Sequence, residues 1–491
     1  MQYIGIDLGT SAVKLLLTDE TGAILASAQA DYPLHFPGPG WSEQDPADWW
    51  DQTAACLKKL IQQTDPKQIA GISVGGQMHG LVILDRNDRV IRPAILWNDN
   101  RTAVQTDWLN REIGKENLLK YTANIAFAGF TAPKLLWLRA EEPENFSAIE
   151  KIMLPKDYLT FRLTGVHCTD YSDASGTLLL DVKRRRWSQE MLGICGIEER
   201  QMPALFESYE PVGTLRAEIA EAFGLPAHVK VAAGAGDNAA AAIGTGTVGE
   251  MQCNISVGTS GTVFLTAKNC MVDPNGALHS FAHADGNFHL MGCMLSAAAC
   301  NRWWMENILG TSDYDKAQKR ISTERLGTNP VIFLPYLMGE RSPHNDPYAR
   351  GCFVGMSMDT TREDMMLAVL EGVAFGLRDN VEAAKALGVT PLSSRVCGGG
   401  AKSELWRKIL ANVLAMPLER VETEEGPAYG ASILAATACG AFPNVKTAAD
   451  RLVKVRDVIE PDAILMEKYE KKYQLFRSVY PKLKSLYRDM S

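Results

Sequence analysis

Three short turns of glycine and hydroxyl residues follow segments that predict β-strands, and each turn could hold phosphate groups. They read DLGTS (7–11), SVGTSG (256–261) and CGGGAKS (397–403). Backbone N–H groups and hydroxyls in such turns match phosphate oxygens. The third turn opens a predicted helix, whose N-terminal amides favour an anion or the edge of a ribose. Because ordinary structural turns need not repeat this composition, its recurrence in both halves of the chain favours phosphate binding.

Two charged residues flank the first of these turns. Asp7 ends a predicted buried strand and could hold Mg²⁺ through water, since magnesium keeps several waters and takes few carboxylates. Lys14, on the returning strand, could add a positive charge beside the phosphates. The alternative is an ordinary turn in which Asp7 and Thr10 satisfy local backbone donors. The residues of this turn alone leave both interpretations open.

A glycine-rich stretch near the middle of the chain, residues 231–249, presents one carboxylate, Asp237. Its two glycine patterns look like dinucleotide fingerprints, but no acid closes the following strand and the second pattern follows a helix. We therefore expect the glycines to turn the strand tightly and to place Asp237 at the start of a helix over 238–243. The helix dipole and nearby amides would keep this carboxylate ionised at neutral pH. A plain N-cap and a general base are both compatible with this position.

The bulk composition excludes several classes of protein. Hydrophobic content of 46% and charged content of 22% are those of a globular chain, and 491 residues predict more than one domain. A formal charge of −8 argues against a nucleic-acid partner. No apolar run reaches the ~18 residues that span a membrane, and ten scattered cysteines suit a reducing, cytoplasmic compartment. His279 and His283 fall in a predicted hairpin, where spacing of four is not a zinc pair.

The elements that must position these groups repeat in the two halves. GIDLGTS and ISVGTSG each place a strand, a turn and a second strand in the same order, which makes them a candidate internal duplication. Thr360 and Glu363 form a predicted capping box before a long helix that Gly388 ends. Strands alternate with helices throughout, so we expect α/β layers in each half and a cleft between the halves.

Taken together, these blocks carry a family resemblance over essentially the full length. The chain resembles the FGGY carbohydrate kinases, within the actin-like ATPase superfamily. GFTAPKLLWL and GGGAKSELWRKILANVLAMPL stand where that family has its two signatures. GQMHG, RPAILWNDNR, LPKDYLTFRLTG and FLPYLMGERSPHND match as well. Glycerol kinases of the family carry Gln-Arg where this chain has Gln77, Met78 and His79, so this departure points towards a ketose.

The resemblance implies a fold, a reaction and a set of site residues. The fold is a two-domain actin-like ATPase (ribonuclease H-like) α/β architecture with an interdomain cleft. An N-terminal domain over 1–248 would bind the sugar and carry the catalytic base, and a C-terminal domain over 249–491 would bind the nucleotide. The reaction is ATP- and Mg²⁺-dependent phosphorylation of D-xylulose to D-xylulose 5-phosphate in the cytoplasm. The resemblance also implies a homodimer, without nucleic-acid or membrane partners. The implied residues are Asp237 as catalytic base, Met78, His79, Asp237 and Asn238 at the sugar, Asp7 at the metal, and Thr10, Ser11, Lys14, Gly258, Thr259, Gly261, Gly399, Gly400, Ala401 and Ser403 around ATP.

Two rival functions remain at this point. A kinase for another ketose or polyol, such as ribulose, fructose or erythritol, would differ only in pocket size and in one or two hydroxyl partners. A nucleotide-gated binding protein, like the actin-like chaperones, would begin with a similar strand and turn. That second rival requires an additional peptide-binding domain, for which this chain has no room, and it does not require Asp237.

Overall fold

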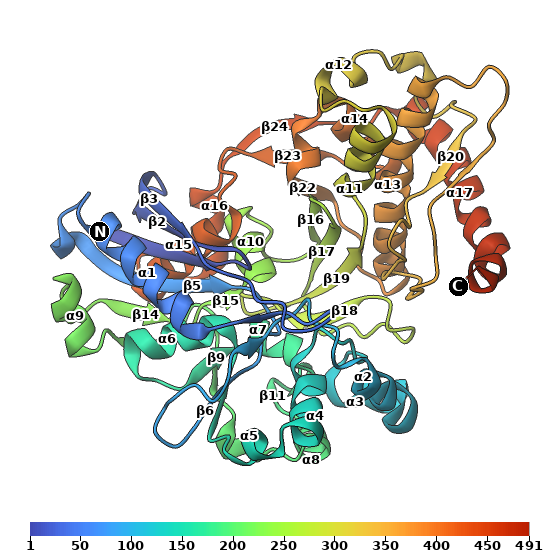
Figure 1. Ribbon diagram of the computed structural model, residues 1–491. Helices are drawn as coiled ribbons and strands as arrows, with labels where there is room; N and C mark the ends of the chain where they lie inside the picture. The colour runs from blue at the N-terminus through green and yellow to red at the C-terminus, as the bar shows by residue number, and fades with distance from the viewer. Residues whose placement is uncertain (491) are drawn as a thin grey trace.

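The computed structural model describes residues 1–490 and contains two seven-stranded sheets, one in each half of the molecule (Figure 1). The first sheet has the order β13-β14-β5-β1-β2-β3, and β15 also pairs with β5. Its strands are β1 (Gln2–Leu8), β2 (Ala12–Asp19), β3 (Ile24–Asp31), β5 (Ile69–Gly76), β13 (Pro211–Thr214), β14 (Lys230–Ala232) and β15 (Ala235–Gly236).

The second sheet has the order β18-β19-β17-β16-β22-β23-β24. Its strands are β16 (Gln252–Val257), β17 (Gly261–Ala267), β18 (His279–Ala282), β19 (Phe288–Met294), β22 (Ser393–Cys397), β23 (Leu418–Val421) and β24 (Val455–Ile459). In each sheet the strand before the Gly-Thr-Ser turn is antiparallel to the strand after it and parallel to a later strand, as β1 is to β2 and β5, and β16 to β17 and β22. The strand-turn-strand repeat expected from GIDLGTS and ISVGTSG is therefore confirmed.

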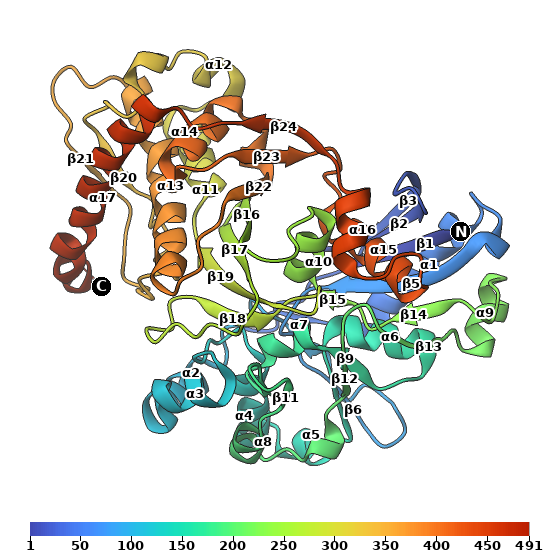
Figure 2. The same ribbon diagram turned by 180° about the vertical axis from the view of Figure 1, so that it is seen from behind.

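Helix α15 (Gly426–Ala438) packs on the first sheet, although it comes from the second half of the sequence. Gly5 of β1 allows this approach, because a Cβ there would overlap the carbonyl oxygen of Ala428. Helix α10 (Asp237–Gly244) lies against α15 equally closely, and both views place α10 between the two sheets (Figures 1 and 2). These contacts fix the start of α10. Helices α1 (Pro46–Ile61) and α6 (Pro155–Thr164) also pack against strands of this sheet.

Helices α13 (Arg362–Ala386) and α14 (Glu404–Leu414) pack against strands of the second sheet, and α17 (Ala463–Asp489) packs against these two helices. Their apolar faces and the sheet together form the largest core cluster. Helix α13 begins one residue later than expected: its N-cap is Thr361, whose hydroxyl accepts from the Asp364 amide, and Asp364 returns the bond. The capping box assigned to Thr360 and Glu363 is therefore wrong by one position, because TTRED contains two overlapping copies of the same pattern.

Residues 77–210 form a third layer of short helices and strands, which lies below the first sheet in Figure 1. It includes α4 (Thr131–Glu141) and α7 (Tyr171–Ala174), and its core also takes in Phe281 and Met291 from the β18–β19 hairpin of the other half. The hairpin expected around His279 and His283 is thus confirmed. The chain crosses between the two sheets after α10; the domain boundary at residue 248 stays a prediction. No helix within residues 1–490 is long and apolar enough to cross a membrane.

Candidate active site

Asp237 is the first residue of α10 and follows β15, which pairs with the end of β5. The N-cap of this helix is Gly236. Among residues 1–490, the Asp237 carboxylate accepts bonds only from its neighbour Asn238, from the backbone N–H at 2.7 Å and from the side-chain amide at 3.0 Å. It therefore does not make the usual N-cap bond to the second or third helical residue. Burial raises the pKa of Asp237 to about 6, and the Asn238 bonds offset part of that rise. The group is mainly ionised at neutral pH, as expected.

Asp7 lies at the same end of the sheet as Asp237. Strand β5 separates them: Asp7 pairs with Gly75, and Gly236 pairs with Gly76. Burial, followed by the charge of Asp237, raises the pKa of Asp7 to about 7, while Lys14 lowers it. Two nearby carboxylates that repel each other fit a divalent cation, whose preferred ligands are oxygens. No group of three or more His, Cys, Asp or Glu side chains suited to a metal occurs within residues 1–490, so water and phosphate oxygens would complete the coordination.

The Lys14 side chain is restrained by an ion pair beside this site. It pairs across the β1–β2 ladder with Asp7, and its ammonium forms an ion pair with Glu425, the residue before α15. Two hydrogen bonds also hold the turn that contains Thr10. The Trp97 indole donates to the Thr10 hydroxyl at 3.0 Å, and the Gln44 side-chain amide donates to the Thr10 carbonyl at 2.7 Å. Ser11, next in the turn, is exposed. These residues form a rigid turn beside Asp7.

His79 follows β5 in a left-handed backbone conformation, with φ of 68°. Its Nδ1 lies 2.7 Å from the carbonyl oxygen of Gly176, so Nδ1 carries the proton and Nε2 is left as an acceptor. Burial, followed by the charge of Lys134, lowers the pKa of His79 to about 3, which keeps the ring neutral. The ring stacks on Phe130 at 4.7 Å between centroids. A neutral, fixed imidazole of this kind can accept one hydrogen bond from a sugar hydroxyl.

Lys134, a site residue that residue-level reasoning missed, holds His79 in place. Its fully buried ammonium donates to the carbonyl oxygens of His79 and Gly129, each at 2.7 Å, and the Thr131 hydroxyl donates to the His79 carbonyl at 3.1 Å. Burial lowers the pKa of Lys134 well below its usual value. The available signal was the charged residue within the apolar run GFTAPKLLWL, which has no place in an ordinary core.

Met78 connects the sugar-side residues to Asp237. Its sulfur lies 3.9 Å from the Asn238 side-chain nitrogen. The Met78 side chain also packs closely against Gly236, because a Cβ added at Gly236 would lie only 2.9–3.1 Å from it. The structure therefore brings Met78, Asn238 and Asp237 together, with His79 adjacent.

The third glycine turn lines a cavity of about 390 Å³ in the second half of the molecule. Four of the expected ATP residues line it, namely Thr259, Gly399, Gly400 and Ser403. Ala401 is buried beneath, while Gly258 and Gly261 belong to the adjoining turn. Helices α11 (Ala298–Arg302) and α12 (Tyr314–Gln318) form further walls of the cavity. No sequence motif indicated their lining residues, which are Ala298, Ala299, Asn301, Arg302, Tyr314, Asp315 and Gln318. The cavity does not include Thr10, Ser11 or Lys14.

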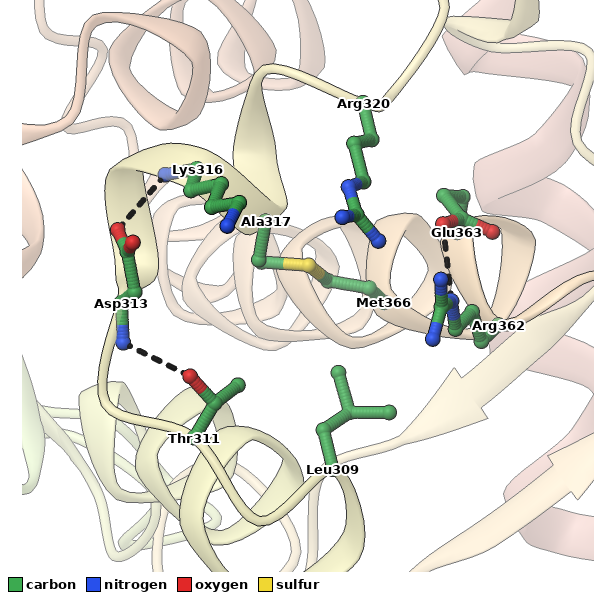
Figure 3. Close-up of a pocket in the computed structure, with 9 residues that line it drawn as sticks. All are labelled: Leu309, Thr311, Asp313, Lys316, Ala317, Arg320, Arg362, Glu363 and Met366. Atoms are coloured by element: carbon green, nitrogen blue, oxygen red, sulfur yellow. Dashed lines mark hydrogen bonds and ion pairs between the residues drawn. The ribbon is translucent and has the colours of Figure 1, made fainter.

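A smaller hollow of about 160 Å³ lies between α12 and the first turns of α13 (Figure 3). Both basic and acidic side chains line this hollow. Arg362 forms an ion pair with Glu363 at 3.1 Å, and the Asp313 carboxylate accepts a hydrogen bond from the Lys316 backbone N–H at 3.1 Å. None of the expected site residues lines this hollow.

Family models match this arrangement in both halves. Residues 2–244 match the N-terminal domain, and residues 253–439 the C-terminal domain, of the FGGY family of carbohydrate kinases. The chain belongs to this family, and it has the family's two-domain actin-like ATPase fold.

Individual relatives are similar over nearly their whole length. A xylulose kinase of Escherichia coli strain K12 is 42% identical over 483 residues, which cover 98% of this chain and 99% of that protein. The crystal structure of a xyloylose kinase from Brucella ovis is 41% identical, with a TM-score of 0.94 and coverage of 99% and 100%. A gluconate kinase from Lactobacillus acidophilus is 28% identical, with a TM-score of 0.94 and coverage of 100% and 99%.

Proposed function

We propose that this protein transfers the terminal phosphoryl group of ATP to the terminal hydroxyl of D-xylulose, giving D-xylulose 5-phosphate and ADP. Membership of the sugar-kinase family and 42% identity to a xylulose kinase support this substrate. One observation carries the proposal: the half-buried Asp237 carboxylate is bonded to Asn238, which contacts Met78, and its charge raises the pKa of Asp7.

Asp237 acts as the general base in this proposal. A loose phosphoryl-transfer transition state delays proton removal, so the base need only orient the hydroxyl and accept its proton as the new P–O bond completes. A carboxylate with a pKa of about 6 is ionised at neutral pH and still basic enough for that transfer. His79 would accept a second hydroxyl at Nε2, and Met78 would pack on the carbon skeleton.

The nucleotide and its metal would be held from both halves. The adenosine side would lie along Gly399, Gly400, Ala401 and Ser403 in the cavity beside α12. The Thr259 turn, with Gly258 and Gly261, would meet the phosphates from one half, and Thr10, Ser11 and Lys14 from the other. Asp7 would hold Mg²⁺, which supplies charge neutralisation at the phosphates.

A panel of substrates tests the choice of sugar. ADP release would be measured with D-xylulose, D-ribulose, D-fructose, erythritol and gluconate at equal concentrations. We expect the highest kcat/KM with D-xylulose. A higher kcat/KM with gluconate, on which a structurally similar kinase acts, would replace the proposed substrate and keep the proposed reaction class.

We place the activity in the cytoplasm, where a reducing environment suits the ten free cysteines of this chain. A homodimer, implied by the family resemblance, stays a prediction that a sedimentation measurement would test.

A further inference from the structure

A series of buried hydrogen bonds runs from the Ala235–Gly236 peptide, which ends one residue before Asp237, into the third layer. The Gly236 N–H donates to the Ser172 hydroxyl at 3.2 Å, and that hydroxyl donates to a carboxylate oxygen of Asp170 at 2.5 Å. The other Asp170 oxygen lies 3.0 Å from the Lys156 ammonium. Ser172, Asp170 and Lys156 have no exposed surface. Two side chains, Ser172 and Asp170, thus connect the backbone beside the proposed base to the buried cation of Lys156.

The Lys156 ammonium, at the end of this series of hydrogen bonds, contacts several groups. Lys156 pairs with Asp157 at 2.6 Å and reaches the Ala233 carbonyl oxygen at 3.4 Å. Its Cβ packs under Gly76, where an added Cβ would approach it to 2.9 Å. Burial alone would lower the pKa of Lys156, but the surrounding carboxylates outweigh burial and raise it. Lys156 therefore stays charged and anchors Asp170.

A further carboxyl group, Asp173, completes the cluster. Neither of its oxygens has a hydrogen-bond partner, and its nearest cation is Lys156 at 3.9 Å. Burial, opposed by Lys156 and reinforced by the neighbouring acids, raises the pKa of Asp173 well above its usual value.

Such a cluster needs an explanation other than stability. A buried ion pair recovers its desolvation cost only with excellent geometry, and apolar residues of the same volume often stabilise a protein equally well. What the cluster provides here is a fixed position for one peptide bond. The Asp237 carboxylate is oriented by Asn238 alone, so the position of its own backbone decides where the carboxylate lies.

We propose that Ser172 is a positioning residue for phosphoryl transfer. Its hydroxyl holds the Ala235–Gly236 peptide, and with it the backbone that leads into Asp237, through a hydrogen bond that Asp170 and Lys156 anchor. The inference rests on the proposed role of Asp237 as the base. A shift of the reacting group by about 1 Å costs about 100-fold in rate. Loss of the Ser172 hydroxyl should therefore slow the chemical step and leave nucleotide binding unchanged.

The test compares Ser172→Ala with Ser208→Ala. The Ser208 hydroxyl donates to the same Asp170 oxygen at 2.7 Å and is equally buried, but it makes no bond to Gly236. We expect Ser172→Ala to lower kcat about 10- to 100-fold with KM for ATP unchanged, and Ser208→Ala to keep kcat within about twofold. Hydrogen exchange over residues 233–241 should accelerate in the Ser172 variant only.

Two results would overturn the positioning role. One is a Ser172→Ala enzyme with unchanged kcat; the other is an equal loss of kcat in both serine variants, which would indicate a general effect on the cluster. Failure of the proposed base is a different outcome, since it would appear as near-normal turnover of Asp237→Ala whatever the serine variants do.

Discussion

Asp7, in β1, lies close enough to Asp237, at the start of α10, for the charge of Asp237 to raise the pKa of Asp7. Strand β5 separates the two residues, and its pairing register brings them to one end of the first sheet. The two acids come from positions 230 residues apart, and each is half-buried. The free protein therefore holds two neighbouring carboxyl groups whose ionised forms, which the proposed function uses, are disfavoured by burial, and that of Asp7 also by the charge of Asp237.

The first prediction concerns stability and pH. Burial raises the pKa of Asp237 from 3.8 to about 6 in the folded protein, so the folded state favours the protonated form. The corresponding stability is present below the unfolded value of 3.8 and is lost as pH rises through about 6. Asp237→Asn removes the charge, and we expect it to raise Tm relative to wild type at about pH 8, without magnesium, and to differ little at about pH 4. An unchanged Tm difference across that range would contradict the pKa shift.

The second prediction concerns the sugar-side histidine. His79→Asn should raise KM for D-xylulose about tenfold through loss of one hydrogen bond, and leave KM for ATP unchanged. His167→Asn is the matched control, since His167 also bonds a backbone carbonyl, that of Ile152 at 2.8 Å, away from the site. Initial rates with each substrate varied in turn would separate the two constants. Equal effects of both variants would remove His79 from the sugar site.

The third prediction concerns the nucleotide cavity. A Cβ at Gly399 would meet no atom within 4 Å, so a larger side chain there fits the fold and enters the cavity. Gly399→Leu should raise KM for ATP about tenfold or more, because the side chain occupies space needed by the nucleotide, with KM for the sugar unchanged. Arg320→Gln, in the separate hollow of Figure 3, should change neither constant. Unaltered ATP kinetics in Gly399→Leu would place the nucleotide elsewhere.

The fourth prediction concerns the contact that fixes α10. A Cβ on Gly430 of α15 would overlap the carbonyl oxygen of Ala240, and neither backbone can move without displacing the first sheet or Asp237. Gly430→Ala should destabilise the protein by about 3 kcal/mol or more and lower kcat. Gly193→Ala, where an added Cβ meets nothing within 4 Å, should be neutral or stabilise by about 0.5 kcal/mol. Thermal unfolding of both variants checks this; an intact Gly430→Ala enzyme would refute the close packing.

Local patterns predicted much of the fold and part of the site. The Gly-Thr-Ser turns were found because a turn between adjacent strands is set by its own residues. Asp237 was found because glycines and an alanine-rich helix flank it. The capping box was misplaced by one residue because Thr360 and Thr361 offer the same local pattern, and only packing of α13 chooses between them.

Contacts between distant segments could not be predicted in this way. Lys14 was expected at the phosphates, and nothing near it in the sequence indicates its ion pair with Glu425. The return of α15 to the first sheet and the bonds from Lys134 to the His79 carbonyl also depend on tertiary placement. These contacts join segments of the chain that no period or motif connects.

The most direct test of the account is the turnover of Asp237→Ala with saturating D-xylulose and Mg·ATP, measured together with ATP affinity. Loss of the group that orients the hydroxyl and accepts its proton should lower kcat by about 1,000-fold or more while ATP binds as tightly as in wild type. Near-normal turnover, with ATP affinity intact, would contradict the assignment of Asp237 as the base.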